Sequence, residues 1–228
     1  MAKASSDQST LQFPSLASKK NLSCEVVEED QIIIIQDALN EDECKRFIDF
    51  VEGLPLELTP PPKKGDAQRV NHRISISSPE FARTLFELFA PHLPSFTPYL
   101  SISSSTRNAK VAEPRVTHSF NSNIRLYKYT EGQYFGCHYD DSVKDPLAAG
   151  VHSEWTILIY LSGVEDGVVG GETVFYKGAG KKKVEIRPTL RRGSALLHKH
   201  GQYCLLHEGA PVLKGTKYVL RSDLMFLD

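Results

Sequence analysis

The stretch IRLYKYTEGQYFGCHYD, residues 124–140, decides the fold class of this chain. It contains two short runs rich in β-branched and aromatic residues, 124–129 and 134–138, with a glycine-containing turn between them. Such runs are typical of paired strands. Further runs of this kind follow at 155–161, 173–176, 184–186, 195–197, 203–207 and 218–226. Many short strands separated by turns predict a double-sheet jelly roll.

The first half of the chain predicts helices that pack on this core. An apolar run at Ile32–Ile35 predicts a buried strand. A helix follows Asn40, because Asn40 and Glu43 have the spacing of a capping box. A second helix begins at Ser78 and stops at Pro91. We expect both helices to pack against the outside of one sheet, so the predicted class is mainly β with flanking helices.

The length of 228 residues suits a single domain. We expect a disordered polar tail over residues 1–24 and one domain over residues 25–228, with its jelly-roll core at about residues 121–228. Two polar segments, residues 59–73 and 101–118, are interpreted as loops.

Charge and cysteine content restrict the surroundings and partners of the protein. The 27 Lys and Arg residues balance 28 Asp and Glu residues, which gives no bulk attraction to nucleic acid or to a membrane. The four cysteines are scattered and form no CxxC motif, so we expect reduced thiols in the cytoplasm or nucleus and no secretion. The serine-rich start leaves a plastid transit peptide as an alternative to a plain tail. The sequence leaves the oligomeric state open.

His138 and Asp140 are the first candidate metal ligands. Residues two apart on a strand point to the same face of the sheet, so both side chains can reach one ion. Two histidines and one carboxylate suit non-haem Fe(II), because they leave positions for a co-substrate and O₂. Three later histidines, His198, His200 and His207, compete to be the third ligand.

Lys217 favours His207 among these three. It lies ten residues after His207 and begins an apolar run, where a buried cation could hold the distal carboxylate of 2-oxoglutarate. The residues ten positions after His198 and His200 are Glu208 and Ala210, which could not do so. Arg221 lies four residues beyond Lys217, on the same strand face, and could aid or replace it.

Four segments carry a family resemblance: HYDDS (138–142), GGETVF (170–175), RPTLRRGSALL (187–197) and LHEGAPVLKGTKYVLRSDLMF (206–226). Together, over roughly residues 121–228, they resemble the prolyl 4-hydroxylase-like branch of the 2-oxoglutarate/Fe(II) oxygenases.

The resemblance implies a double-stranded β-helix with His138, Asp140 and His207 as iron ligands and Lys217 as the 2-oxoglutarate anchor. It also implies that Tyr129 and Thr173 line the co-substrate pocket. The implied reaction is hydroxylation of a C–H bond with Fe(II), 2-oxoglutarate and O₂, releasing succinate and CO₂, and we expect ascorbate to support it.

The substrate is the least determined feature. The resemblance favours a residue in a peptide or protein, with proline first, and a small molecule is the alternative. A non-catalytic metal-binding sensor would not need Lys217. A nucleic-acid demethylase is disfavoured because no basic, aromatic-rich groove stands out, and a halogenase is disfavoured because Asp140 is present.

One charged segment is a candidate substrate lid. Within residues 63–73, the side chains of Arg69, Asn71 and Arg73 alternate, so they would share a face if the chain is extended. Charged loops beside a pocket often contact substrate, and ordinary solvated charge is the alternative.

Overall fold

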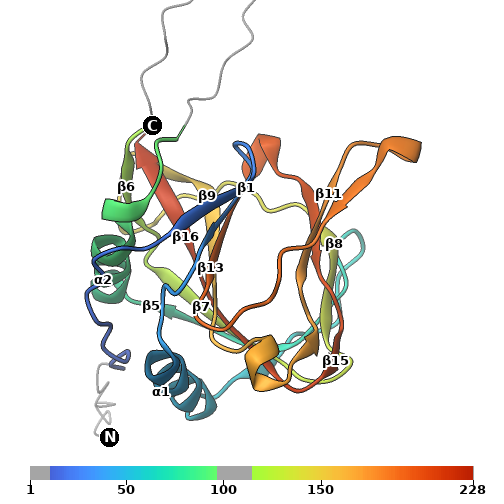
Figure 1. The fold of residues 1–228 in the computed structure, drawn as a ribbon, viewed down its shortest axis with the longest axis horizontal. Coiled ribbons are helices and arrows are strands. Elements are labelled where there is room, and N and C mark those ends of the chain that lie inside the picture. Colours follow the sequence, from blue (N-terminus) through green and yellow to red (C-terminus); the bar gives the residue numbers. More distant parts are fainter. Residues whose placement is uncertain (1–10, 97–114, 228) are drawn as a thin grey trace, which may run out of the picture.

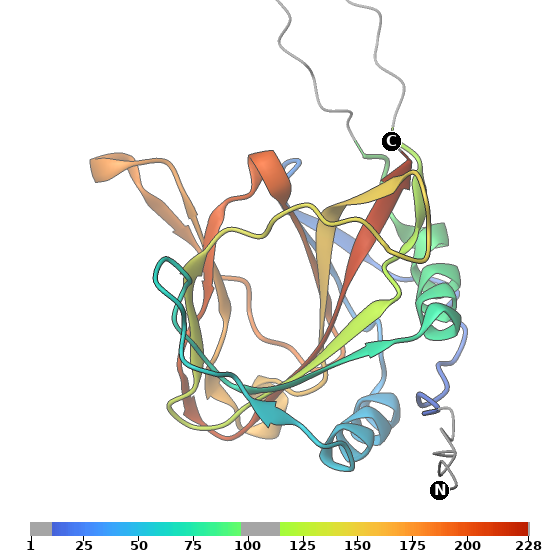
Figure 2. The same cartoon turned by 180° about the vertical axis from the view of Figure 1, so that it is seen from behind.

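Two antiparallel sheets face one another in the computed structural model, which describes residues 11–96 and 115–227 (Figures 1 and 2). The larger sheet has the order β1-β2-β13-β9-β16-β7-β5-β3, and β6 pairs with β16. Its strands are β1 (Cys24–Glu28), β2 (Ile32–Ile35), β3 (Glu57–Leu58), β5 (His72–Ser77), β6 (Thr117–Phe120), β7 (Asn123–Tyr129), β9 (Val151–Tyr160), β13 (Ala195–Lys199) and β16 (Lys217–Leu227).

The smaller sheet has the order β12-β11-β14-β8-β4. Its strands are β4 (Arg69–Val70), β8 (Tyr134–His138), β11 (Thr173–Lys177), β12 (Val184–Ile186) and β14 (Leu206–Gly209). A separate pair joins β10 (Val169–Gly170) to β15 (Val212–Lys214). Short 3₁₀ turns are η1 (Ala90–His92), η2 (Val164–Asp166), η3 (Gly180–Lys182) and η4 (Gly201–Tyr203). This arrangement confirms the predicted jelly roll.

Two helices, α1 (Glu41–Glu52) and α2 (Pro79–Phe89), lie outside the larger sheet (Figure 1). The predicted capping box is present: the Asn40 side chain accepts from the Glu43 N–H, and the Glu43 carboxylate accepts from the Asn40 N–H. Ser78 caps α2 by a single bond, in which its hydroxyl oxygen accepts from the Phe81 N–H. Neither helix is long and apolar enough to cross a membrane, and no other described segment forms such a helix.

Strand β16 separates the hydrophobic core from the space between the sheets. Alternate residues such as Leu220 and Leu224 join a large apolar cluster with both helices. Residues on the opposite face of the strand, Lys217, Val219 and Arg221, line a pocket between the two sheets. Because side chains alternate along a strand, one face of β16 packs in the hydrophobic core and the other face lines the pocket.

Some expected boundaries differ from the structure. The segment 59–73 is a loop only in part, because Arg69–Val70 pairs with β8 and His72–Ser77 pairs with β7. Most of the loop expected at 101–118 lies outside the described residues, and its end, from Thr117, belongs to β6. The strand expected at 203–207 begins only at Leu206, after the turn η4.

Within the expected disordered tail, residues 11–24 pack against the domain, whereas residues 1–10 lie outside the described residues. The Phe13 ring stacks on Phe81 with 4.1 Å between ring centroids. Lys19 pairs with the buried carboxylate of Glu43 at 2.5 Å, and that carboxylate also accepts from the Ala17 N–H. One half-buried aromatic side chain and one buried acid therefore attach a segment whose composition is polar.

Replacing Phe13 with alanine is expected to lower the free energy of unfolding by about 1–2 kcal/mol, because it removes this half-buried ring. Urea titration followed by circular dichroism measures the change. Leu11→Ala is the matched control, since Leu11 is 47% exposed, and its effect should stay within about 0.5 kcal/mol. Equal effects of the two variants would contradict the packing of Phe13.

Candidate active site

Strand pairing brings the three predicted metal ligands together. In the β8–β14 pair, His138 and His207 are directly opposite one another, and their ring centroids are 4.2 Å apart. Asp140 follows the end of β8. His138 Nε2 lies 3.7 Å from Asp140 Oδ1, and His207 Nε2 lies 3.8 Å from Asp140 Oδ2. The potential ligand atoms of the three residues all lie within 4.8 Å of one another, so they could hold one metal ion.

Hydrogen bonds orient both imidazoles for metal binding. His138 Nδ1 donates to the Gly136 carbonyl at 2.8 Å, and His207 Nδ1 donates to the Leu205 carbonyl at 2.9 Å. Each Nε2 therefore carries the lone pair. Burial, and next the nearby His207, lower the pKa of His138 to about 4, and burial lowers the pKa of His207. Both rings are neutral at pH 7, which metal binding requires.

Asp140 is held as a carboxylate by polar neighbours. Burial alone would raise its pKa, but the guanidinium of Arg221, 2.9 Å from Oδ2, holds that pKa well below its usual range. The Thr156 hydroxyl lies 3.1 Å from Oδ2 and 2.9 Å from His200 Nδ1. His200 Nε2 in turn lies 2.8 Å from the Ser153 hydroxyl. This buried chain fixes the direction in which Asp140 points.

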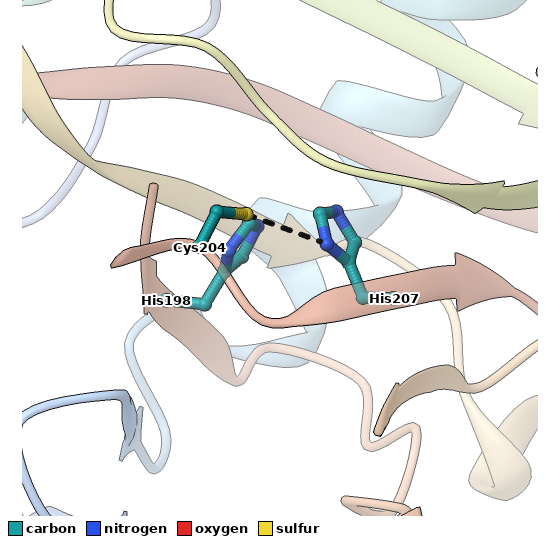
Figure 3. Close-up of side chains that lie close together, drawn as sticks. All are labelled: His198, Cys204 and His207. Atoms are coloured by element: carbon teal, nitrogen blue, oxygen red, sulfur yellow. Dashed lines mark hydrogen bonds between the residues drawn. The ribbon is translucent and has the colours of Figure 1, made fainter. Parts of the chain in front are cut away.

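A second group, His198, Cys204 and His207, also lies close enough to hold an ion (Figure 3). Cys204 Sγ is 3.8 Å from His207 Nδ1, but that nitrogen already donates to Leu205. Burial raises the pKa of Cys204 to about 11, which disfavours the thiolate that a metal needs. His198 Nε2 also faces Asp140 Oδ2, at 3.6 Å. The chemistry of the donors therefore favours His138, Asp140 and His207.

The four residues expected to bind the co-substrate all line the pocket that contains these ligands. Lys217 is buried, and its Nζ donates to the Gly171 carbonyl at 2.6 Å. Tyr129 lies beside it, with 5.2 Å between Nζ and the ring centroid. Thr173 Oγ1 lies 2.7 Å from the hydroxyl of Tyr160. Burial lowers the pKa of Lys217 to about 8, so the ammonium still predominates at pH 7.

Arg221 lies in the same pocket but is engaged differently from Lys217. Its guanidinium contacts both oxygens of Asp140 and one oxygen of Asp223. Because Arg221 already pairs with a candidate metal ligand, Lys217 is the better placed of the two cations to receive the distal carboxylate of a co-substrate.

The three residues of the expected lid take different positions. Arg69 lines the pocket, with its guanidinium carbon 4.6 Å from the Tyr127 ring centroid and 4.3 Å from that of Phe135. Asn71 is fully buried and accepts from Arg69 Nε at 2.9 Å. Arg73 lines a neighbouring cleft.

Sequence reasoning did not select several residues that line the pocket: Tyr127, Phe135, Leu158, His198, Gly209 and Val219. The alternation of β7 and β16 could have identified Tyr127 and Val219, since they share a strand face with Tyr129 and Lys217.

Fold and site together define a jelly-roll protein with a candidate two-histidine, one-carboxylate metal centre. Residues 124–222, which include all three candidate ligands and Lys217, match the family described as the 2OG-Fe(II) oxygenase superfamily. This match confirms the resemblance seen in the sequence, over residues 124–222. No curated protein matches the sequence.

Solved structures of low sequence identity share the fold. A viral collagen prolyl hydroxylase from Paramecium Bursaria Chlorella virus-1, in complex with 2OG, is 18% identical with a TM-score of 0.52, over 87% of this chain and 97% of that chain. A Trichoplax adhaerens prolyl hydroxylase, in complex with a hypoxia inducible factor peptide, is 14% identical with a TM-score of 0.57, over 88% and 84%. HygX from Streptomyces hygroscopicus, with nickel and 2-oxoglutarate bound, is 12% identical with a TM-score of 0.52, over 86% and 82%.

Proposed function

We propose that this protein is an Fe(II)- and 2-oxoglutarate-dependent dioxygenase that hydroxylates a C–H bond and releases succinate and CO₂. The supporting observation is that one pocket contains the cluster His138, Asp140 and His207 together with the buried cation Lys217. A metal site alone would also suit a sensor. A buried ammonium facing the same space favours turnover of a dicarboxylic co-substrate.

Each residue has a defined role in this proposal. His138, Asp140 and His207 would hold Fe(II), which supplies the capacity to activate O₂ when it is bound. Lys217 would neutralise the distal carboxylate of 2-oxoglutarate, while Tyr129 and Thr173 shape the walls around it. Thr156 and Arg221 keep Asp140 ionised and oriented. Ascorbate would support turnover as a reductant.

The proposed substrate is a residue in a peptide or protein, with proline favoured by likeness to prolyl hydroxylases. A small-molecule substrate is the second candidate, because the cleft beside the metal site is lined mainly by charged and polar groups. The four cysteines are free thiols in the structure, which supports the proposal of a reducing, intracellular compartment.

Turnover tests this proposal directly. Purified protein with Fe(II), ascorbate, O₂ and 2-oxoglutarate is expected to form succinate slowly even without its prime substrate, and omission of iron should stop the reaction. Release of ¹⁴CO₂ from 1-¹⁴C-2-oxoglutarate measures the same step independently. Iron-independent succinate formation would contradict the proposal.

Affinity for 2-oxoglutarate is expected to fall as the pH rises above about 8. Lys217 binds a carboxylate only when it is protonated, and its lowered pKa lies at about 8 in the free protein. Below that pH the dissociation constant should be flat. Above it, the dissociation constant should rise by up to about tenfold per pH unit, until the pH reaches the pKa of Lys217 in the complex with 2-oxoglutarate. Anaerobic calorimetry with Mn(II) measures the profile.

Lys217→Arg is the matched control for this profile, because an arginine stays charged throughout. Its affinity should be independent of pH over the same range, whatever its absolute value. A wild-type profile that is equally flat would show that Lys217 does not hold the co-substrate.

Replacing Thr156 with valine is expected to weaken metal binding by about 10- to 100-fold, because it removes the hydroxyl that orients Asp140 but keeps the side-chain volume. Competition with a fluorescent chelator measures the metal affinity. Thr84→Val is the control, since Thr84 is half-buried on α2 and does not line the pocket. Unchanged affinity in Thr156→Val would remove Thr156 from the site.

A further inference from the structure

A cleft of about 540 Å³ opens beside the candidate metal centre, and cations predominate in its lining. It shares His138, Asp140 and Arg221 with the inner pocket, so the two spaces meet at the metal ligands. Its cationic residues are Lys63, Arg69, Arg73, Arg125 and Arg221. Its carboxylates are Asp66, Asp140 and Asp141. Asp140 would be neutralised further by a metal ion, so the cleft is electropositive when it is loaded.

The strand register places these arginines close together. In the β5–β7 pair Arg73 is opposite Tyr127, and in the β7–β16 pair Arg125 is opposite Arg221. Like charges that are directly opposite in a sheet destabilise it. Asp223 offsets part of this cost, since its carboxylate lies 3.1 Å from Arg125 and 3.4 Å from Arg221. Asp223 therefore contacts both guanidinium groups, and Arg221 also pairs with Asp140.

Among the described residues, two further guanidinium groups lack a carboxylate partner. Arg73 makes no ion pair with any carboxylate in residues 11–96 and 115–227, although Glu57 is its cross-strand neighbour. Arg69 Nη2 is buried and has no hydrogen-bond partner there. Burial would raise the pKa of Tyr127, but the guanidinium groups of Arg221, Arg69 and Arg125 around it lower that pKa. Clustered, desolvated cations are costly unless an anion joins them.

The co-substrate does not account for all of these cations. Lys217 lines the inner pocket and is the proposed partner of the distal carboxylate of 2-oxoglutarate. Arg73 and Arg125 line the cleft but not the inner pocket, so they lie beyond the space that 2-oxoglutarate would fill. The lining of the cleft has five cations and three carboxylates, and Asp223 adds a fourth carboxylate. One positive charge is therefore left over. A second ligand with a single carboxylate matches this surplus better than a polyanion.

We infer that the prime substrate carries a carboxylate, which Arg73 and Arg125 bind in this cleft while its reactive C–H bond faces the metal centre. The inference rests on the proposed oxygenase function and narrows its substrate class. The carboxylate belongs to a small organic acid or to an acidic side chain in a peptide. In both cases the same two guanidinium groups recognise it.

Ligand relaxation in NMR tests this inference, because bound Mn(II) broadens the signals of any molecule that lies near it. Protein loaded with Mn(II) and 2-oxoglutarate is titrated without O₂ with two matched pairs of probes. N-acetylproline and its neutral amide represent small acids. Acetyl-prolyl-aspartate amide and acetyl-prolyl-asparagine amide represent peptides. We expect the signals of at least one acid to broaden at a probe concentration about tenfold lower than its neutral partner requires. The pair that discriminates identifies the source of the carboxylate.

Arg73→Gln is expected to remove this preference, and Arg73→Lys should restore it in part, whereas the exposed Arg83→Gln should change nothing. Arg73 makes no ion pair with the described part of the chain, so the variant is expected to fold. Equal broadening by both members of each pair would overturn the inference. Tighter binding of single-stranded oligothymidylate than of either acid would also overturn the inference, because it would assign the arginines to a phosphate backbone.

The affinity of each variant for 2-oxoglutarate separates this inference from the proposed function. A parallel loss of that affinity in Arg73→Gln would assign Arg73 to the co-substrate and overturn the inference alone. Failure of the wild-type protein to bind 2-oxoglutarate with Mn(II) would overturn the proposed function, and the inference with it.

Discussion

Replacing His207 with alanine is expected to reduce the rate of succinate formation by more than about 100-fold. Loss of a residue that only orients a ligand already costs about 10- to 100-fold, and loss of a ligand costs more. His207 faces both His138 and Asp140, so its removal would leave the candidate metal ion with two of its three proposed ligands. Succinate detected by mass spectrometry, together with bound iron measured by elemental analysis, reports the effect.

Two controls make this result specific. His118→Ala removes an exposed histidine of β6 and should leave activity and iron content unchanged. His198→Ala distinguishes the two candidate metal groups, because His198 belongs only to the group with Cys204. Loss of iron in His198→Ala, with iron retained in His138→Ala, would contradict the assigned ligands.

Replacing Lys217 with alanine is expected to weaken 2-oxoglutarate binding by about 30- to 1000-fold, equivalent to about 2–4 kcal/mol. The removed ammonium is buried, so water cannot readily replace it as the partner of the distal carboxylate. Metal affinity should be retained, since Lys217 contacts none of the three ligands. Anaerobic calorimetry with Mn(II) measures both affinities in one preparation.

Lys214→Ala is the matched control, because Lys214 is exposed on β15. The comparison also separates the two cations that the sequence proposed as anchors. Normal binding in Lys217→Ala, with binding lost in Arg221→Gln despite retained metal, would make Arg221 the anchor and contradict this assignment.

Strand positions and the candidate ligands could be predicted because they depend on local sequence patterns. The edges of β8 and β12 match the predicted runs, since glycine and polar residues bound those runs sharply. His138 and Asp140 were found by a spacing of two along one segment. Their approach to His207 depends on the β8–β14 register. The ten-residue spacing from His207 to Lys217 and the order of motifs in the family resemblance indicated that approach indirectly.

The arginine cluster could not be predicted because it depends on contacts between distant segments. Arg69, Arg73, Arg125 and Arg221 are separated by up to about 150 residues and meet only through the pairing of β4, β5, β7 and β16. The sequence therefore showed no basic groove. The packing of Phe13 was missed for a similar reason, since a single aromatic residue in a polar segment carries no periodic signal.

We propose that one pocket binds a metal ion through His138, Asp140 and His207 and binds 2-oxoglutarate through Lys217. Calorimetric titration of 2-oxoglutarate into the wild-type protein without O₂, with and without Mn(II), tests it most directly. We expect binding at one site per chain with Mn(II), and at least about tenfold weaker binding without the metal. Binding that is equally tight with and without Mn(II), or no binding in either case, would contradict it.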